Sequence, residues 1–557
     1  MSAYTIGLDF GTNSVRALIV DVHDGRELSE HVFNYPSGDA GVILKSDQPN
    51  LARQHPADYL AGIESSVREA LKIAANADKN FSADKVIGIG VDTTGSTPLP
   101  VDADGMALGL KKQFENEPAA MAWLWKDHTS HAEAEEITAA AAKQRPQYLA
   151  KCGGRYSSEW YWAKILRCAR SSPTVFAAAA SWVEIADWIP AVLSGTTALN
   201  KLKRGACAAG HKCFFNTKWG GFPDEAFLSS LNPGLARVRK SLPDQCATVA
   251  DAAGGLSGEW AAKLGLPVGI SVAVGAFDAH LGAIGAGVRA GTLVKIMGTS
   301  TCDIMVEGMS RQMADIPGLC GIADESVLPA HFGLEAGQSA VGDIFNWFVK
   351  MNSGSHQALT VGAAKLQPGE SGLLTLDWHN GNRTILVDQR LTGLTVGQTL
   401  HTTAAEIYRS LIEATAYGAR VIAERFESYG VAVKRVVNCG GVATRSPLAM
   451  QIYADVFNRP VAVSRSTQTC ALGSAIAASV AAGPKHGGHA DFNAAMTAMS
   501  GEPNIVYNPI PAHAAVYERL FKLYVQLHDA FGVRGHQAVL SNIMKDLLDL
   551  RDSIHAH

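Results

Sequence analysis

Residues 4–21 read YTIGLDFGTNSVRALIVD, and this stretch predicts the fold. Apolar residues alternate with others on both sides of Gly11-Thr12-Asn13, a pattern typical of two strands joined by a tight turn. The same design returns at residues 291–306, GTLVKIMGTSTCDIMV, with Gly298-Thr299-Ser300 as the turn. Each hairpin is followed by further strands and helices. The chain therefore predicts an α/β protein in which one domain has been duplicated.

Periodicity predicts the elements that follow each hairpin. In the first half we expect a third strand over 27–35, a helix introduced by Pro56 and a buried strand over 86–91. In the second half we expect helices near 402–427, 446–457 and 470–482, and strands over 435–438 and 460–464. We place the boundary near 285–290, which gives domains 1–287 and 288–557. Without a low-complexity linker between them, the two domains are expected to touch across a cleft. Residues 512–550 are expected to form helices packed on the second half, with a coiled coil as the alternative.

Composition excludes several classes of protein. The chain has 557 residues, 47% of them apolar and 18% charged, with a formal net charge of −4. These values exclude global disorder and a basic surface for nucleic acid. The longest run of small apolar residues, 470–483, is short of the ~20 needed to cross a membrane. The N-terminus lacks the pattern of a signal peptide, so we expect a cytoplasmic protein. Nine irregularly spaced cysteines favour reduced thiols, and Cys207, His211 and Cys213 lack the spacing of a metal site.

Glycine-rich turns are the first candidate for a binding site. A turn such as Gly11-Thr12-Asn13 is often an ordinary hairpin, but its main-chain N–H groups can also hold a phosphate. A similar glycine turn recurs near residue 298, and a third one, Gly440-Gly441, lies between a predicted strand and a predicted helix. A nucleotide commonly binds at such a strand end. The P-loop sequence and a strand-linked dinucleotide fingerprint are both absent from the chain, which argues against those two nucleotide-binding classes.

Two aspartates at strand ends are candidates for chemistry. Asp278 follows an apolar strand and could accept a proton from a hydroxyl group, but it could equally cap the following helix. Asp9 precedes the first turn, where it could hold a hydrated metal ion or stabilise the turn. His280 and His331 favour packing or hydrogen bonding over metal ligation. Most tryptophans are expected in the core, whereas Trp125 lies in a polar loop that could belong to a site.

Four segments together resemble the FGGY carbohydrate kinases: GLDFGTNSVR (7–16), GAFD (275–278), MGTST (297–301) and GGVATRSPLAMQIYAD (440–455). The resemblance extends from the first strand to about residue 485. It implies two duplicated actin-like, ribonuclease H-like ATPase domains facing a central cleft. Five further segments look like those of the bacterial members that phosphorylate the terminal hydroxyl of L-ribulose in arabinose breakdown: GVDTTGSTP (90–98), LWKDHT (124–129), SSEW (157–160), AAGHK (208–212) and GLEAGQS (333–339).

The resemblance also assigns roles to residues. Asp278 resembles the general base, and Asp9 and Asp278 would reach magnesium through water. Lys212 and Glu335 look like sugar ligands with Ser96 beside them, although Lys212 taken alone could be a solvated surface residue. The resemblance implies that ATP is held by Gly11, Thr12, Asn13, Thr299, Gly342, Asn346, Gly440, Gly441 and Arg445.

The expected reaction is transfer of the γ-phosphoryl group of ATP to the 5-hydroxyl of L-ribulose, with closure of the cleft on sugar binding. Three alternatives stay open. The chain could act on another pentulose or pentitol, such as D-ribulose, xylulose or ribitol. It could be an ATPase without a sugar substrate, or a non-catalytic actin-like module that binds nucleotide. The expected partners are a small sugar and ATP, and a homodimer is a further possibility.

Overall fold

The computed structural model describes residues 3–503 and 505–555. Its first large sheet runs in the order β10-β11-β6-β1-β2-β3, with β12 also paired to β6. The strands are β1 (Tyr4–Phe10), β2 (Ser14–Asp21), β3 (Glu27–Asn34), β6 (Val86–Thr93), β10 (Ala252–Gly255), β11 (Ser271–Ala273) and β12 (Ala276–Phe277). The second large sheet runs β15-β16-β14-β13-β19-β20-β21. Its strands are β13 (Thr292–Met297), β14 (Thr301–Gly308), β15 (Gly321–Asp324), β16 (His331–Ala336), β19 (Arg435–Cys439), β20 (Val461–Val463) and β21 (Ile505–Tyr507).

The two sheets repeat the same topology. In the first, β1 pairs antiparallel with β2 and parallel with β6. In the second, β13 pairs antiparallel with β14 and parallel with β19. Each sheet also has an antiparallel strand beyond the parallel ones, β10 beside β11 and β21 beside β20. The duplicated α/β fold predicted from the two glycine hairpins is therefore confirmed strand by strand.

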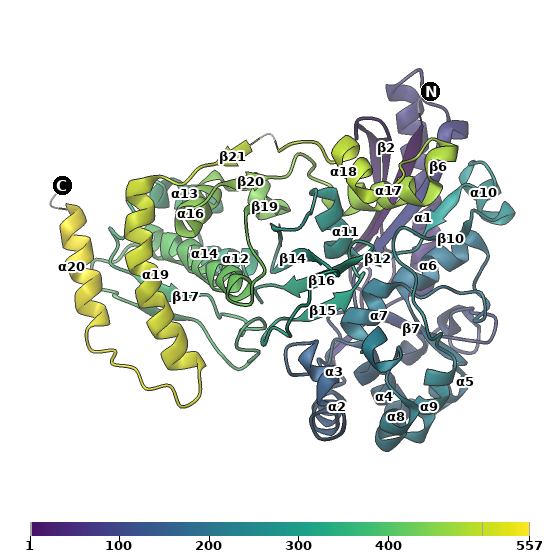
Figure 1. The fold of residues 1–557 in the computed structure, drawn as a ribbon, viewed down its shortest axis with the longest axis horizontal. Coiled ribbons are helices and arrows are strands. Elements are labelled where there is room, and N and C mark those ends of the chain that lie inside the picture. The colour runs from purple at the N-terminus through teal and green to yellow at the C-terminus, as the bar shows by residue number, and fades with distance from the viewer. Residues whose placement is uncertain (1–2, 504, 556–557) are drawn as a thin grey trace.

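Helices cover both sheets (Figure 1). Those before residue 290 are α1 (Pro56–Ala77), α2 (His131–Gln144), α3 (Pro146–Ala150), α4 (Tyr161–Ser171), α5 (Pro173–Ala178), α6 (Ile185–Ser194), α7 (Ala206–Lys212), α8 (Glu225–Leu231), α9 (Pro233–Lys240), α10 (Gly258–Leu264) and α11 (Asp278–Gly285). Those after it are α12 (Gly342–Met351), α13 (His356–Ala363), α14 (Ala404–Ser428), α15 (Gly441–Arg445), α16 (Pro447–Phe457), α17 (Thr469–Ala482), α18 (Phe492–Met499), α19 (Pro511–Gly532) and α20 (Ile543–His555). The smaller sheets contain β4 (Ile43–Lys45), β5 (Gln48–Gln54) and β8 (Ala122–Trp123), then β7 (Pro98–Val101) and β9 (Ser181–Glu184), then β17 (Leu374–Leu376) and β18 (Leu394–Val396).

Helix α17 crosses the division between the halves. It belongs to the second half by sequence, yet it packs on β1 and β6 of the first sheet and along α11, as Figure 1 shows. Glycines allow this close approach, since a Cβ at Gly7 would lie 1.8 Å from the carbonyl oxygen of Ala471 and one at Gly90 would lie 1.9 Å from that of Ser474. The helix therefore ties the two halves together, and a division at residue 287 stays a prediction.

The C-terminal helices pack on the second half, as predicted. Buried tyrosines of α19 hydrogen-bond to that half: the hydroxyl of Tyr524 donates to Asp377 at 2.7 Å, and that of Tyr517 donates to Glu413 at 2.8 Å. The buried face of α20 belongs to the same core. Within the described residues, no helix has the length and apolar character needed to cross a membrane. All nine cysteines are free thiols, in agreement with the sequence analysis.

Candidate active site

Asp278 is the first residue of α11 and directly follows β12. Phe277 occupies the N-cap position of this helix, so the alternative in which Asp278 caps it is wrong. The N–H of Ala279 donates to Oδ1 of Asp278 at 2.6 Å. Burial, together with the negative charges of Asp9 and Glu335, raises the pKa of Asp278 to about 7 and outweighs the opposing effects of the Ala279 N–H and Lys212. A carboxylate poised near neutral pH suits a general base.

A pair of carboxylates lies next to Asp278. The parallel register of β1 and β6 places Asp9 opposite Asp92, and the hydroxyl of Ser474 donates to Oδ2 of Asp92 at 2.6 Å. Burial raises the pKa of both carboxyl groups, and that of Asp92 rises further because of the charge of Asp9. Asp92 therefore favours its protonated form more strongly than an ordinary aspartate does. The sequence analysis did not single out Asp92, although its place at the end of the strand beside β1 could have indicated it.

The oxygen donors at this place fit a hard divalent cation. The charge of Asp9 raises the pKa of Asp92 and of Asp278, and the charge of Asp278 raises that of Asp92 further, so a cation among these carboxylates would be stabilised. Carboxylate oxygens and water are the ligands that Mg²⁺ prefers. The residues present therefore agree with a magnesium site near Asp9 and Asp278.

The glycine turns of the second half come together at the end of β13. The N–H of Gly342, at the start of α12, donates to the carbonyl oxygen of Gly298 at 3.1 Å, and that of Asp343 donates to the carbonyl oxygen of Thr299 at 3.1 Å. Gly440 has a φ of 87°, and a Cβ there would lie 2.7 Å from the carbonyl oxygen of Met297. Two glycine turns and the N-terminus of α12 thus meet at one place, where an anion could be held.

Two of the residues predicted to bind ATP have side chains in contact with other groups of the same chain. Oδ1 of Asn346 lies 2.8 Å from Nε2 of His356, and Nε of Arg445 donates to the carbonyl oxygen of Gly441 at 3.0 Å. Both residues are exposed.

The turn at Gly11 is braced by the loop that the sequence analysis singled out. The N–H of Gly11 donates to the carbonyl oxygen of Ser14 at 2.9 Å, which closes the hairpin. Nε1 of Trp125 donates to the hydroxyl oxygen of Thr12 at 3.0 Å, and Nε2 of Gln54 donates to the carbonyl oxygen of Thr12 at 2.8 Å. Asn13 is exposed at the tip of the turn. Trp125 therefore belongs to the site and not to the core alone.

Lys212 and Glu335 form a buried ion pair between the two halves. Lys212 ends α7, Glu335 lies on β16, and Nζ donates to Oε1 at 2.9 Å and to Oε2 at 3.0 Å. Only 5% of Lys212 and 9% of Glu335 are exposed, so the surface alternative for Lys212 is wrong. Burial alone would raise the pKa of Glu335, but Lys212 outweighs it and holds the pKa well below the usual range. Nζ of Lys212 also lies 5.1 Å from the ring centroid of Trp160, which adds an aromatic wall.

Ser96 is held in place by two buried charges that the sequence analysis missed. Nζ of Lys164 donates to the carbonyl oxygen of Ser96 at 2.7 Å, and also to those of Trp123 and Leu124. Glu184 accepts hydrogen bonds from the Ser96 hydroxyl and, at 2.7 Å, from the N–H of Thr97. Burial lowers the pKa of Lys164 to about 7. These contacts fix the backbone at Ser96.

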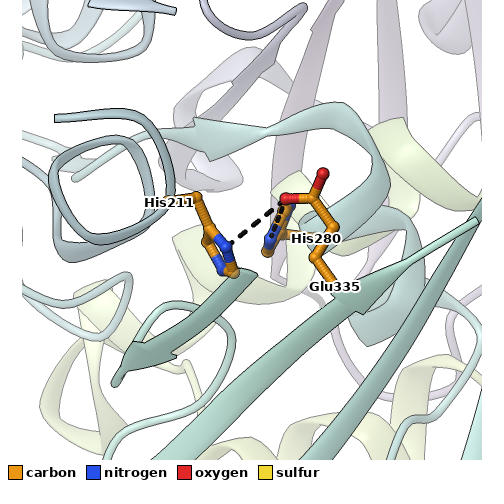
Figure 2. Close-up of side chains that lie close together, drawn as sticks. All are labelled: His211, His280 and Glu335. Carbon is orange, nitrogen blue, oxygen red and sulfur yellow. Dashed lines mark ion pairs between the residues drawn. The ribbon is translucent and has the colours of Figure 1, made fainter. Parts of the chain in front are cut away.

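Two buried histidines lie behind Glu335 (Figure 2). Nδ1 of His211 is 3.4 Å from Oε2 of Glu335, and Nε2 of His280 is 3.7 Å from the same atom. Burial lowers the pKa of His280 to about 4 and that of His211 well below its usual value, so both rings are neutral at neutral pH. The sequence placed these residues on separate segments and gave no sign that they meet.

Asp278 links the sites. The charges of Asp9 and Glu335 raise its pKa and that of Lys212 lowers it, so the candidate base is within electrostatic range of both the carboxylate pair and the buried ion pair. Such an arrangement can bind a polar molecule beside the ion pair and remove a proton from one of its hydroxyl groups.

Comparisons with known proteins show which family the chain belongs to. Residues 4–285 match the model of the N-terminal domain of the FGGY family of carbohydrate kinases, and residues 293–482 match that of its C-terminal domain. The chain is 41% identical to a ribulokinase of Shouchella clausii over 99% of this chain and 98% of that protein. It is 42% identical to a ribulokinase of Vibrio parahaemolyticus over 94% and 95%. The fold is also similar to that of a crystal structure described as a xyloylose kinase from Brucella ovis, with a TM-score of 0.78, 21% identity and coverage of 94% and 98%.

Proposed function

The chain belongs to the FGGY family of carbohydrate kinases and is a sugar kinase that uses ATP, and from this premise we propose that it phosphorylates the terminal 5-hydroxyl of L-ribulose. The product would be L-ribulose 5-phosphate, an intermediate of L-arabinose breakdown. The observation that carries the proposal is the position of Asp278, between the carboxylates at Asp9 and the Lys212–Glu335 pair. End-to-end similarity to ribulokinases supports the choice of a ketopentose.

In the proposed mechanism the sugar lies against Lys212 and Glu335, with the backbone at Ser96 beside it. Lys212 donates to a sugar oxygen and Glu335 accepts from a sugar hydroxyl, which fixes the sugar relative to Asp278. As the hydroxyl oxygen bonds to the γ-phosphorus and the bond to ADP breaks, Asp278 takes the hydroxyl proton. Binding and orienting the sugar thus precede proton removal at one carboxylate.

Phosphates would be held by backbone N–H groups. The turn from Gly11 to Asn13, together with Thr299, would hold the phosphates, while Gly342, Gly440 and Gly441 would let the backbone approach the nucleotide. Asn346 and Arg445 would lie at the adenosine end, once they leave their present partners. Asp9 and Asp278 would hold magnesium through water, and the bound ion neutralises phosphate charge.

The substrate proposal is tested by measuring ADP release with a coupled assay. The sugars to compare are L-ribulose, D-ribulose, xylulose, ribitol and glycerol, with a reaction lacking sugar as the control. We expect kcat/KM to be highest for L-ribulose and ADP release without sugar to be near zero. A higher kcat/KM for another sugar would replace L-ribulose as the substrate, since a few polar contacts decide such stereochemistry. A rate of ADP release that does not change with any sugar would indicate an ATPase. No ADP release under any condition would indicate a nucleotide-binding module.

A homodimer and a cytoplasmic location stay predictions from the sequence. Size-exclusion chromatography with light scattering measures the first, and fractionation of cells measures the second.

A further inference from the structure

Two buried histidines face Glu335 with N–H groups that have no acceptor. His211 is the next-to-last residue of α7, just before Lys212, and His280 lies two residues after Asp278. Both side chains point at the same carboxylate oxygen (Figure 2). Their distances from Oε2 of Glu335, 3.4 and 3.7 Å, exceed a good hydrogen bond. Within the described residues, neither ring nitrogen of His280 nor Nδ1 of His211 has a hydrogen-bond partner. Unpaired polar groups at such depth are rare and need an explanation.

The contacts of each ring indicate where its proton lies. Oγ of Ser326 lies 2.9 Å from Nε2 of His211 and 3.3 Å from the carbonyl oxygen of Ala323, and donation of its one proton to the nearer acceptor leaves an N–H on Nδ1 of His211. The alternative tautomer would aim a bare lone pair at the carboxylate. For the same reason, His280 carries its N–H on Nε2, the nitrogen that faces Glu335. Two neutral N–H donors therefore stand ready at one oxygen of an ionised carboxylate.

Lys212 explains why the N–H groups of the two histidines make no hydrogen bond to Glu335 in the absence of a sugar. Its ammonium group donates to both oxygens of Glu335, at 2.9 and 3.0 Å, and draws the carboxylate toward itself. A sugar that inserts between them, accepting from Lys212 and donating to Glu335, separates the two groups. Glu335 would then lose part of its hydrogen bonding while it stays buried, which is costly for a charged group.

We propose that His211 and His280 are positioning residues for Glu335 in the sugar complex. When the sugar separates Glu335 from Lys212, both N–H groups close on Oε2, and Oε1 is left to accept from a sugar hydroxyl. The histidines thereby replace the lost donors and fix the direction of the carboxylate. This inference rests on the proposed role of Lys212 and Glu335 as sugar ligands.

A metal ion is the other occupant that the cluster could accept. The nitrogen atoms of His211 and His280 and an oxygen of Glu335 all lie within 4.8 Å of one another, as zinc ligands do. However, the ammonium group of Lys212 already neutralises the carboxylate from 2.9 Å, and it would repel a second cation. Hydrogen bonding is therefore the favoured role.

The experiment compares substitutions that keep or remove each N–H. His280→Gln keeps a donor at the ε position, His211→Asn keeps one at the δ position, and leucine at either site removes it. The control is His331→Leu, at the start of the strand that carries Glu335 but bonded to the carbonyl oxygen of Pro329. The sugar is whichever one the wild-type enzyme phosphorylates fastest, so the result does not depend on L-ribulose being that sugar.

We expect the leucine variants to raise the KM for sugar about 10-fold or more, the effect of losing a hydrogen bond to a charged group. The KM for ATP should stay unchanged, as should both constants in the control, and the Gln and Asn variants should stay within about 3-fold of wild type. An unchanged sugar KM, or equal loss in the conservative and leucine variants, would overturn the proposal. If one leucine variant does not fold, the pair of variants at the other histidine decides.

Two further measurements distinguish this proposal from its alternatives. In a crystal structure with sugar, Nε2 of His280 should lie within about 3.2 Å of Oε2, whereas the present 3.7 Å would contradict the proposal. Equilibrium dialysis with Zn²⁺ should give the same stoichiometry for wild type and His280→Leu. One ion fewer in the variant would make the cluster a metal site instead.

Discussion

Replacing Asp278 with asparagine is expected to lower turnover by about 10²- to 10⁴-fold, the usual worth of general-base assistance. The amide has almost the same shape but cannot take the proton of the sugar hydroxyl. Because the nucleotide is proposed to bind mainly to backbone turns, the KM for ATP should change by less than about 3-fold. The assay is coupled ADP release, first with the sugar varied at saturating ATP and then with ATP varied at saturating sugar.

The pH dependence follows from the environment of Asp278. Burial and the charges of Asp9 and Glu335 raise its pKa to about 7, so the base is protonated and inactive at lower pH. For wild type, kcat/KM should rise about 10-fold per pH unit below this pKa and level off above it. In the Asn variant, kcat/KM should no longer rise with pH in this range. Turnover within about 10-fold of wild type, or an unchanged rise with pH in the variant, would refute the assignment of the base.

The same shift predicts a stability effect with a definite sign. The folded pKa, about 7, lies above the ordinary aspartate value of 3.8, so folding favours the protonated carboxyl group and ionisation destabilises the fold. The cost begins as the pH rises above about 4 and is complete above about 7. About three pKa units set an upper limit of about 4 kcal/mol, reduced to roughly 1–3 kcal/mol because the side chain is only half-buried. The Asn variant should be more stable than wild type by this amount at pH 8, and equally stable at pH 4.

Asp546→Asn is the matched control, because Asp546 is also in the first turn of a helix but is exposed on α20. Its activity and its stability at both pH values should equal those of wild type. A gain in stability at pH 8 in this control would show that the effect does not come from burial.

Two other substitutions separate the sugar site from the nucleotide site. Lys212→Ala should raise the KM for sugar at least about 10-fold more than that for ATP, and should cost about 3–5 kcal/mol of stability because its partner carboxylate is left buried and unpaired. Equal effects on both KM values would indicate a structural role. The control is Lys263→Ala, at an exposed lysine. Gly342→Ala should raise the KM for ATP and leave that for sugar unchanged, since its Cβ would lie 2.5 Å from the carbonyl oxygen of Gly298 and push the two turns apart. Gly258→Ala, whose Cβ meets no atom within 4 Å, is the control, and an unchanged ATP KM in Gly342→Ala would contradict the placement of the nucleotide.

The sequence predicted those parts of the fold that depend on local periodicity. The strand over 4–10 and the strand over 86–91 were found, the second two residues short of β6, and the helix expected over 402–427 is α14. Alternation with a period of two, and apolar spacing of three to four residues, are properties of neighbouring residues and can be read without a partner.

Other features depend on contacts between distant segments and were not predicted. Strands β15 and β16 went unnoticed, although β16 carries Glu335, because their short runs give little pattern of their own. The packing of α17 on the first sheet was also missed, although Gly7 and Gly90 in the facing strands are local signs of it. The meeting of His211, His280 and Glu335 needs three elements brought together by the fold.

The decisive measurement is a crystal structure with L-ribulose and a non-hydrolysable ATP analogue. We expect the 5-hydroxyl oxygen within about 3.2 Å of a carboxylate oxygen of Asp278 and in line with the γ-phosphorus, with the sugar also touching Lys212 and Glu335. A sugar bound away from Asp278, or a different carboxylate at the 5-hydroxyl, would contradict the proposed function.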